Sequence, residues 1–190
     1  MPDATEPQPS GSTPIGTDVR GPSSDVTEPQ PSGSAPTGTD AMKAHAAALG
    51  LDVEVVSRPP ARSLAKAADL LGIEPGDIVK SLVVRRSDGE YLFALVPGGR
   101  KIDWAKLRGV VGTNRLSLPD AGQAKDATGY ERGTITPLGS TTAWPVFADE
   151  RIRGRRVGLG GGAHGLSTFV DGDALLSALD ATVADITAEE

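Results

Sequence analysis

Two neighbouring stretches of the chain, residues 78–86 and 90–96, are rich in apolar residues that favour β-strands, and in the first of them Lys80 falls on the same alternating face as Ile78, Leu82 and Val84. A period of two is typical of β-strands, whose side chains point to opposite faces in turn. The intervening Ser-Asp-Gly has the composition of a tight turn, so the pattern predicts a β-hairpin. Further strands are expected at residues 51–56, 145–147, 156–159 and 166–170.

Helical spacing alternates with these strands. Leu64, Ala68 and Leu71 recur at i, i+4 and i+7, with Ser63 before them as an N-cap and Gly72 after them as a stop. Comparable signals predict helices at residues 41–49, 103–107, 119–127 and 171–179. Hairpins mixed with short helices favour an α+β fold, with a mixed, largely antiparallel sheet flanked by short helices.

Residues 1–40 differ in composition from the rest of the chain. They hold eight of the 15 prolines, and two 14-residue strings that begin at Thr5 and Thr27 agree at 12 positions. Neither string has an apolar face that a repeat could bury, which favours a duplicated disordered linker over a solenoid. A short polyproline ligand is the alternative. The expected organisation is a disordered tail, residues 1–40, followed by one folded domain, residues 41–190.

The acidic character of the protein comes mainly from its two ends. The chain carries 19 basic and 25 acidic residues, a formal net charge of −6. Residues 41–170 alone carry 18 basic and 13 acidic residues, a net charge of +5. This middle part could face a polyanion such as a nucleic acid, and solvated surface charge is the alternative interpretation.

Composition excludes several classes of chemistry. The absence of cysteine rules out disulfides, thiol nucleophiles and cysteine-bound metal centres, and two histidines are too few for a multi-histidine metal site. No apolar run reaches the roughly 20 residues that span a bilayer, and the first residues lack the apolar core of a signal peptide. We expect a soluble, cytoplasmic protein that makes no use of a membrane, a cofactor or a metal.

Residues 160–165 form a glycine-rich segment, Gly-Gly-Gly-Ala-His-Gly, that matches G-x-G-x-x-G. A dinucleotide site would need a helix after this segment, whereas the next residues predict a strand. The segment is better interpreted as a tight loop between strands, where the backbone approaches another group closely. His164 within it is a candidate base, or simply a polar surface residue.

Lys80 is a second candidate because alternation places it on one strand face with three aliphatic residues, Ile78, Leu82 and Val84. Its ammonium must either reach water at the sheet edge or point at a fixed anion. The third candidate is the segment 133–139, in which a glycine and a proline bracket the sequence Gly-Thr-Ile-Thr-Pro. It predicts either a plain turn or a rigid loop that presents backbone N–H groups to a substrate carbonyl.

Taken in order, these segments resemble the YbaK-like aminoacyl-tRNA deacylase family, which is related to the editing domain inserted in bacterial prolyl-tRNA synthetases. The resemblance extends from Arg62 to Ile186. No single marker is specific, but the ordered set is. The markers are residues 67–72, 78–83, 91–97, 128–130, 133–139, 160–166 and 183–186.

The resemblance implies trans-editing, the hydrolysis of the ester in a mischarged aminoacyl-tRNA, with Cys- or Ala-tRNA of the proline type as the leading substrates. It implies that Lys80 and Gly133 are catalytic and hold the aminoacyl adenosine end, and that both loops supply substrate-binding residues. Those residues are Thr134, Ile135, Thr136, Pro137, Gly161, Gly162, His164, Gly165 and Ser167. The implied partner is the 3′ acceptor end of tRNA, with an aminoacyl-tRNA synthetase as a further candidate.

The resemblance implies no protein nucleophile, because the ribose 2′-hydroxyl, a substrate side chain or a positioned water can attack the ester. This agrees with the composition. An aminoacyl ester is already activated, so backbone donors, one cation and positioning could suffice in a chain without cysteine.

The chain departs from the family pattern around the glycine loop. Ala163 and His164 stand where relatives often carry a basic pair, Gly160 replaces a polar residue, and Ser167 replaces an acidic or polar one. These departures affect the choice of substrate more than the reaction class. Two other hypotheses stay open: a non-catalytic tRNA- or synthetase-binding module of the same fold, and a nucleotide- or anion-binding protein built on the glycine loop.

Overall fold

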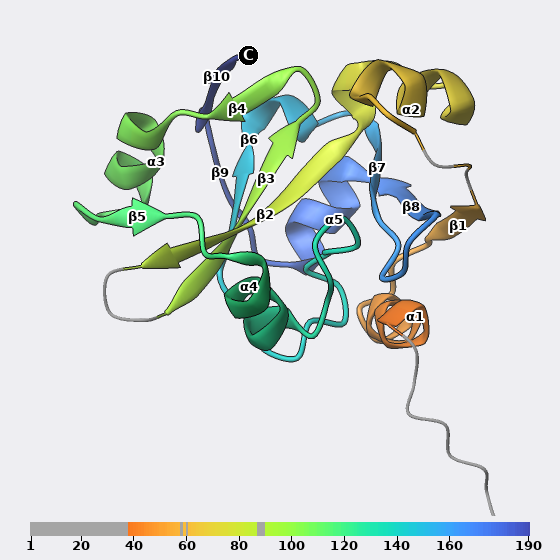
Figure 1. Cartoon of the computed structure of the whole chain (residues 1–190), viewed down its shortest axis with the longest axis horizontal. Helices are drawn as coiled ribbons and strands as arrows, with labels where there is room; N and C mark the ends of the chain where they lie inside the picture. The colour runs from red at the N-terminus through yellow and green to blue at the C-terminus, as the bar shows by residue number, and fades with distance from the viewer. Residues whose placement is uncertain (1–37, 58, 60, 87–89) are drawn as a thin grey trace, which may run out of the picture. The chain divides into compact units, whose positions relative to one another are not determined.

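Two antiparallel strands, β2 (Val79–Arg86) and β3 (Tyr91–Pro97), form the centre of the fold (Figure 1). They pair from Val79 opposite Pro97 to Arg85 opposite Tyr91, which confirms the predicted hairpin. The structure is a computed structural model that describes residues 38–57, 59, 61–86 and 90–190. The expected turn at residues 87–89 therefore lies outside the described residues.

The hairpin belongs to a five-stranded mixed sheet in the order β5-β2-β3-β6-β9. β6 (Val146–Asp149) and β9 (Thr182–Ala184) add to β3 in parallel, whereas β5 (Leu116–Ser117) pairs antiparallel with Arg85 and Arg86 at the end of β2. The first half of β2 instead lies beside β7, to which a bridge between Ile78 and Gly158 connects it.

Two smaller antiparallel sheets complete the architecture. The first has three strands in the order β1-β8-β7, and the second joins β10 to β4. The predicted α+β fold, with a mixed and largely antiparallel sheet, is confirmed. The bounds are β1 (Glu54–Ser57), β4 (Arg100–Ile102), β7 (Arg156–Gly160), β8 (Leu166–Asp171) and β10 (Thr187–Glu189).

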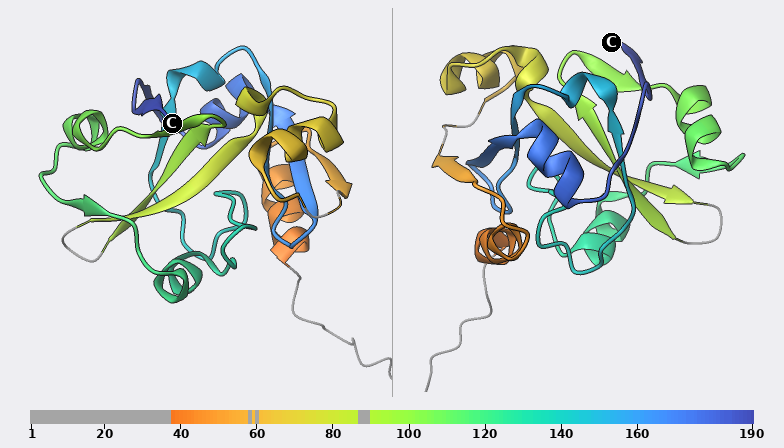
Figure 2. Two further views of the ribbon diagram at one scale, coloured as in Figure 1. Left: turned by 45° about the horizontal axis from the view of Figure 1, so that its top comes forward. Right: turned by 180° about the vertical axis from the view of Figure 1, so that it is seen from behind.

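Helices cover both faces of the five-stranded sheet, and the sheet separates the core into two clusters (Figure 2). On one face, Leu175 of α5 and Met42 of α1 pack against Phe93 and its neighbours. On the other face, Leu107 of α3 packs against Leu92 and its neighbours. The helices are α1 (Gly38–Ala48), α2 (Leu64–Leu71), α3 (Trp104–Val111), α4 (Ala121–Thr128) and α5 (Gly172–Ala178), with 3₁₀ turns η1 (Pro75–Asp77) and η2 (Glu150–Ile152).

The predicted N-cap Ser63 is confirmed, and Asp103 and Asp171, the first residues of two predicted helices, also act as N-caps, since each side chain accepts a backbone N–H from the first turn of its helix. The helix expected from Pro119 starts later, because Asp120 caps α4 and forms a capping box with Gln123.

Helix α1 starts at Gly38 rather than at residue 41, so the expected boundary between tail and domain falls inside a helix. The rest of the predicted tail, residues 1–37, lies outside the described residues. Within the described part of the chain, no helix has the length and apolar character needed to cross a membrane.

Candidate active site

A cavity of about 630 Å³ opens beside the first half of β2. Its walls come from β2, α2, the start of α4, the residues 132–135 and the pair β7–β8. Elements far apart in sequence therefore converge on one space, and four of the predicted site residues lie in its wall. These four are Lys80, Gly133, Ile135 and Ser167.

The two loops that the sequence singled out touch through their backbones. The amide of Gly162 donates to the carbonyl of Thr134 at 3.2 Å. A Cβ added at Gly160 would lie only 2.6 Å from the carbonyl oxygen of Ile135, so this contact requires glycine. The glycine-rich segment joins β7 to β8 as a tight loop, as predicted. A dinucleotide-binding turn would lead into a helix, whereas this segment leads into the strand β8.

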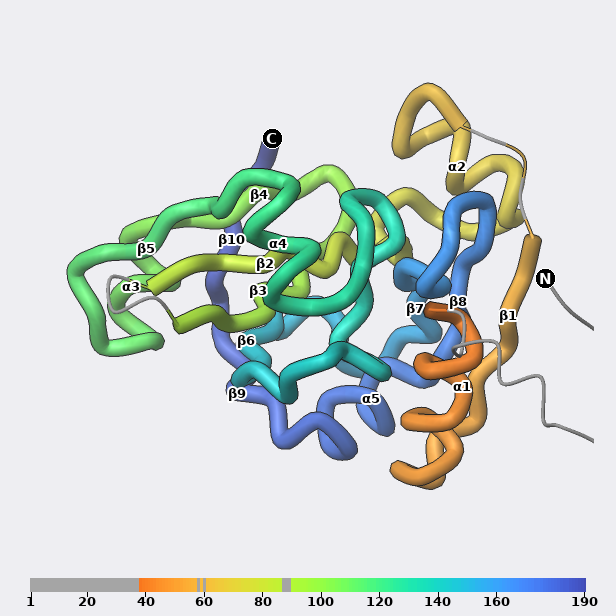
Figure 3. Tube along the Cα trace, turned by 60° about the horizontal axis from the view of Figure 1, so that its bottom comes forward, coloured from red at the N-terminus to blue at the C-terminus, as the bar shows by residue number. Residues whose placement is uncertain are grey.

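Helix α1 lies beside the β7–β8 pair (Figure 3) and forms hydrogen bonds to both loops. The hydroxyl of Thr39 donates to the carbonyl of Gly161 at 2.7 Å, and the amide of Gly139 donates to Nδ1 of His45 at 2.9 Å. The phenol of Tyr130 lies 2.7 Å from the carbonyl oxygen of Leu138 and donates to it. Burial raises the pKa of Tyr130 to about 12, so this donor keeps its proton.

The remaining predicted residues support the loops and do not line the cavity. Thr134, Thr136 and Pro137 are buried, and the hydroxyl of Thr134 donates to the carbonyl of Glu131 at 2.8 Å. His164 is exposed, with Nε2 3.2 Å from a carboxylate oxygen of Glu131. The other predicted glycines, Gly161, Gly162 and Gly165, also lie outside the cavity wall.

Lys80 contributes to the cavity wall, but its ammonium points toward β4 and the C-terminal strand. Nζ donates to the carbonyl of Arg100 at 2.5 Å and to the carboxylate of Glu190 at 2.7 Å. This matches the fixed-anion interpretation of its position among aliphatic residues, with the anion supplied by the chain itself. The hydrogen bond from Lys80 holds the pKa of Glu190 below its usual range.

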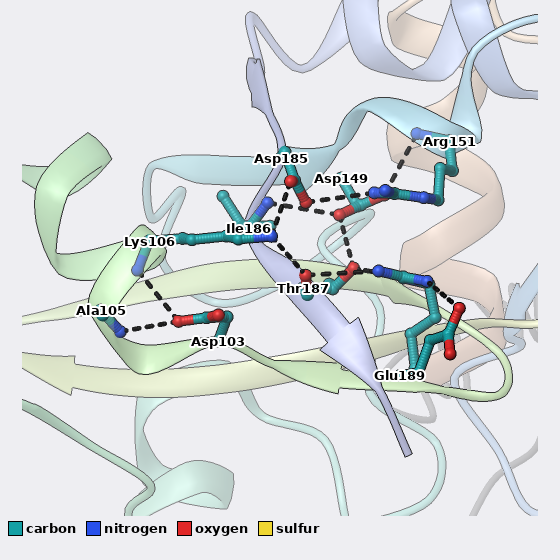
Figure 4. Close-up of polar contacts among 10 residues, drawn as sticks. Asp103, Ala105, Lys106, Asp149, Arg151, Asp185, Ile186, Thr187 and Glu189 are labelled. Carbon is teal, nitrogen blue, oxygen red and sulfur yellow. Dashed lines mark hydrogen bonds and ion pairs between the residues drawn. The ribbon is translucent and has the colours of Figure 1, made fainter.

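A polar network holds the C-terminal strand β10 in place (Figure 4). The carboxylate of Asp149 is fully buried and accepts from the hydroxyl of Thr187 at 2.7 Å and from Arg151 at 3.0 Å. Burial, the largest effect, acts to raise the pKa of Asp149, but these hydrogen bonds outweigh it and lower the pKa. A hydrogen bond from Lys106, supported by one from Arg151, lowers the pKa of Asp185 to about 2.

Three further polar residues of the wall were not predicted as site residues: Ser81, Asp120 and Arg132. The hydroxyl oxygen of Ser81 is buried and has no hydrogen-bond partner among the described residues. Asp120 and Arg132 are exposed and add one anion and one cation to the wall. The alternation of β2 gave no signal for Ser81, because it places Ser81 on the face opposite to that of Lys80, yet both residues line the cavity.

The cavity is equipped for electrostatic stabilisation rather than for nucleophilic attack by a side chain. Its described wall holds two cations, one carboxylate and two serines but no histidine, and the described residues contain no cluster of three potential metal ligands. The amides of Gly133 and Ile135 donate to no other described residue, so both can serve a ligand. Free amides at a cavity wall can stabilise a developing oxyanion.

Comparisons with known proteins agree with this geometry. The family model of the aminoacyl-tRNA editing domain matches residues 58–178. A candidate Cys-tRNA(Pro)/Cys-tRNA(Cys) deacylase of Enterococcus faecalis, EbsC, is 29% identical over 129 residues, which are 67% of this chain and 79% of that protein. Proline–tRNA ligase of Maridesulfovibrio salexigens is 33% identical over 100 residues, 53% of this chain but only 17% of the ligase.

A solved structure described as a candidate trans-editing enzyme for prolyl tRNA synthetase superimposes with a TM-score of 0.73 at 28% identity. The match covers 80% of this chain and 97% of that one. The family model spans more than half of the chain and includes β2 and both site loops. The chain therefore belongs to the aminoacyl-tRNA editing domain family.

Proposed function

We propose that this protein is a cytoplasmic aminoacyl-tRNA deacylase that acts in trans on mischarged tRNA. The observation that carries the proposal is the cavity of about 630 Å³ around which β2 and the two touching loops converge. Its volume of about 630 Å³ lies within the range of small-molecule sites and can admit the terminal nucleoside with its amino acid. Membership of the editing family and the names of its relatives support the same reaction.

The wall supplies groups that an aminoacyl ester needs. As water adds to the ester carbon, negative charge develops on the carbonyl oxygen, where the amides of Gly133 and Ile135 can stabilise it. The free amino group of the ester is cationic, and Asp120 is the one carboxylate in the described wall. The ester C–O bond then breaks, and the ribose oxygen leaves with a proton.

Lys80 takes part by exchanging its internal partner for the substrate. Glu190 is 53% exposed and Lys80 29% exposed, so their ion pair is accessible to solvent and stabilises the fold little. A ribose hydroxyl or phosphate oxygen can therefore replace Glu190 at the ammonium. Arg132 is a second cation in the same wall and can hold the RNA end beside it.

The attacking group comes from the substrate or from water. Ser81 and Ser167 are in the wall, but no histidine stands beside them there to act as a base. A positioned water, which the ribose 2′-hydroxyl can help to orient, is one remaining nucleophile; a substrate thiol is the other, and its attack would release the amino acid as a cyclic thioester that water then opens. A small amino acid is the expected substrate, and Cys- or Ala-tRNA of the proline type are the leading choices; a synthetase is the expected protein partner.

A deacylation panel tests the proposal. The full chain is incubated with Cys-, Ala- and Pro-charged proline tRNA and with Cys-charged cysteine tRNA, and the loss of the ester is followed against the uncatalysed rate. We expect accelerated hydrolysis of a Cys or Ala ester and an intact Pro ester. Binding of uncharged tRNA without acceleration for any ester would contradict the proposal and favour the non-catalytic binding module.

A further inference from the structure

A second hollow, the arginine hollow, lies at the far end of β2. It encloses about 270 Å³ and is lined by Arg85, Arg86, Arg115, Leu116 and Ser117. The pairing of β5 with β2 creates it, because Arg85 lies opposite Ser117 and Arg86 lies opposite Leu116. Two arginines of β2 and the arginine directly before β5 thereby line one space.

Two of the three arginines that line the hollow are exposed to solvent, and the third is paired. Arg85 and Arg115 are exposed, and Arg86 is half-buried and forms an ion pair with Glu90 at 3.5 Å. Its described wall contains three cations and no acidic residue. A guanidinium presents a planar fork of donors that fits two oxygens of a phosphate, so the hollow has the chemistry of a phosphodiester site.

The linings of the arginine hollow and of the candidate active site follow one another along two segments of the chain. Residues 115–117 line the hollow, and Leu118, which directly follows them, lines the cavity. On β2, Ser81 lines the cavity and Arg85 lies four residues further along the same face, about 13 Å away at the usual rise of a strand. Leu118, which directly follows the residues of the hollow and lines the cavity, is 56% exposed and offers an apolar surface to a sugar or a base.

We infer that the arginine hollow binds phosphodiester groups of the single-stranded RNA end whose terminal nucleoside occupies the cavity. The identity of that RNA as tRNA rests on the proposed function. The nucleotides before the terminal one pass over Leu118, and their phosphates meet Arg85, Arg86 and Arg115. These contacts position the RNA without reading its sequence.

The test measures the affinity of the full chain for an uncharged tRNA minihelix with a single-stranded 3′ overhang, over a series of salt concentrations. Arg85→Gln/Arg115→Gln removes two exposed cations and keeps the ion pair of Arg86 with Glu90. Arg153→Gln, which removes an exposed arginine outside both hollows, is the matched control. Circular dichroism and thermal unfolding confirm that each variant is folded.

We expect the double variant to bind the minihelix at least about tenfold more weakly at low salt. The slope of log K against log salt should become less negative by about 1.4, the value for the loss of two contacts to a single strand. An affinity and slope equal to those of Arg153→Gln would overturn the inference. If the double variant loses affinity while no ester is hydrolysed by the unmodified chain, only the proposed function fails.

Discussion

Nδ1 of His45 accepts a hydrogen bond from the backbone amide of Gly139 at 2.9 Å, and this contact joins helix α1 to the end of the 133–139 loop. The two residues are 94 positions apart in the chain. His45 lies before the matched part of the family, so this support for the site comes from outside the editing domain model.

Replacing His45 by alanine leaves the amide of Gly139 without this acceptor in a half-buried position. We expect a loss of about 1–3 kcal/mol in the free energy of unfolding, together with slower deacylation because the loop loses its support. Urea unfolding and initial rates measure the two effects. His164→Ala is the matched control, because this exposed histidine contacts Glu131 at the surface; equal losses in both variants would contradict the role of His45.

Gly160→Ala tests the contact between the two site loops. The added methyl group would come within 2.6 Å of the carbonyl of Ile135, so the loops must separate. We expect the free energy of unfolding to decrease by about 1–3 kcal/mol and the rate of deacylation to decrease as well.

Gly109→Ala provides the control for this substitution, since a Cβ at Gly109 in helix α3 meets nothing within 4 Å. Alanine there should raise the free energy of unfolding by about 0.5–1 kcal/mol. Thermal unfolding compares the two variants, and a stable, fully active Gly160→Ala would show that the loops do not need their close approach.

Local signals in the sequence predicted most of the core elements. Ser63, Asp103 and Asp171 have capping side chains that act on their own helices, and the apolar run of β3 reflects burial on both faces, by the two halves of the core. The strands β4, β5, β9 and β10 were not predicted. Each has only two or three residues, too short for a period to be visible, and each exists because a distant strand supplies its partners.

The candidate site was predicted only where its residues carry a local signal in the sequence. The 133–139 loop and the glycine loop have local signatures, and so could be found before their contact was known. The partner of Lys80 could not be found, because Glu190 reaches it only through the pairing of β10 with β4. Arg132 and Asp120 line the cavity because the fold brings their segments to it, and no pattern in the sequence indicates this.

Glu190→Gln should make Lys80 more available to the substrate. The hydrogen bond from Lys80 lowers the pKa of Glu190, so the carboxylate is ionised and competes for the ammonium at neutral pH. We expect a several-fold lower KM for mischarged tRNA in this variant. Glu189→Gln, at the neighbouring position with a 91% exposed side chain, is the control, and a Glu190→Gln variant as impaired as Lys80→Ala would instead assign Glu190 a positioning role.

Stability should decrease in acid because of the carboxylates around β10. The pKa of Asp185 is about 2 in the folded protein against an ordinary value of 3.8, with hydrogen bonds from Lys106 and then Arg151 as the causes. A lowered pKa stabilises the folded state above about pH 4, and this contribution is lost as the pH falls through about 2. Urea unfolding between pH 7 and pH 2 should therefore show a smaller loss of stability in Asp185→Asn than in the unmodified chain. An identical pH dependence would contradict the assignment.

The most direct test of the account is the rate of ester hydrolysis by Lys80→Ala on whichever mischarged tRNA the unmodified chain deacylates. Circular dichroism and urea unfolding first establish that the variant keeps its fold. The account predicts a decrease in kcat/KM on the order of a hundredfold, the usual effect of removing one preorganised charge-stabilising donor. A folded Lys80→Ala variant that deacylates at the unmodified rate would contradict it.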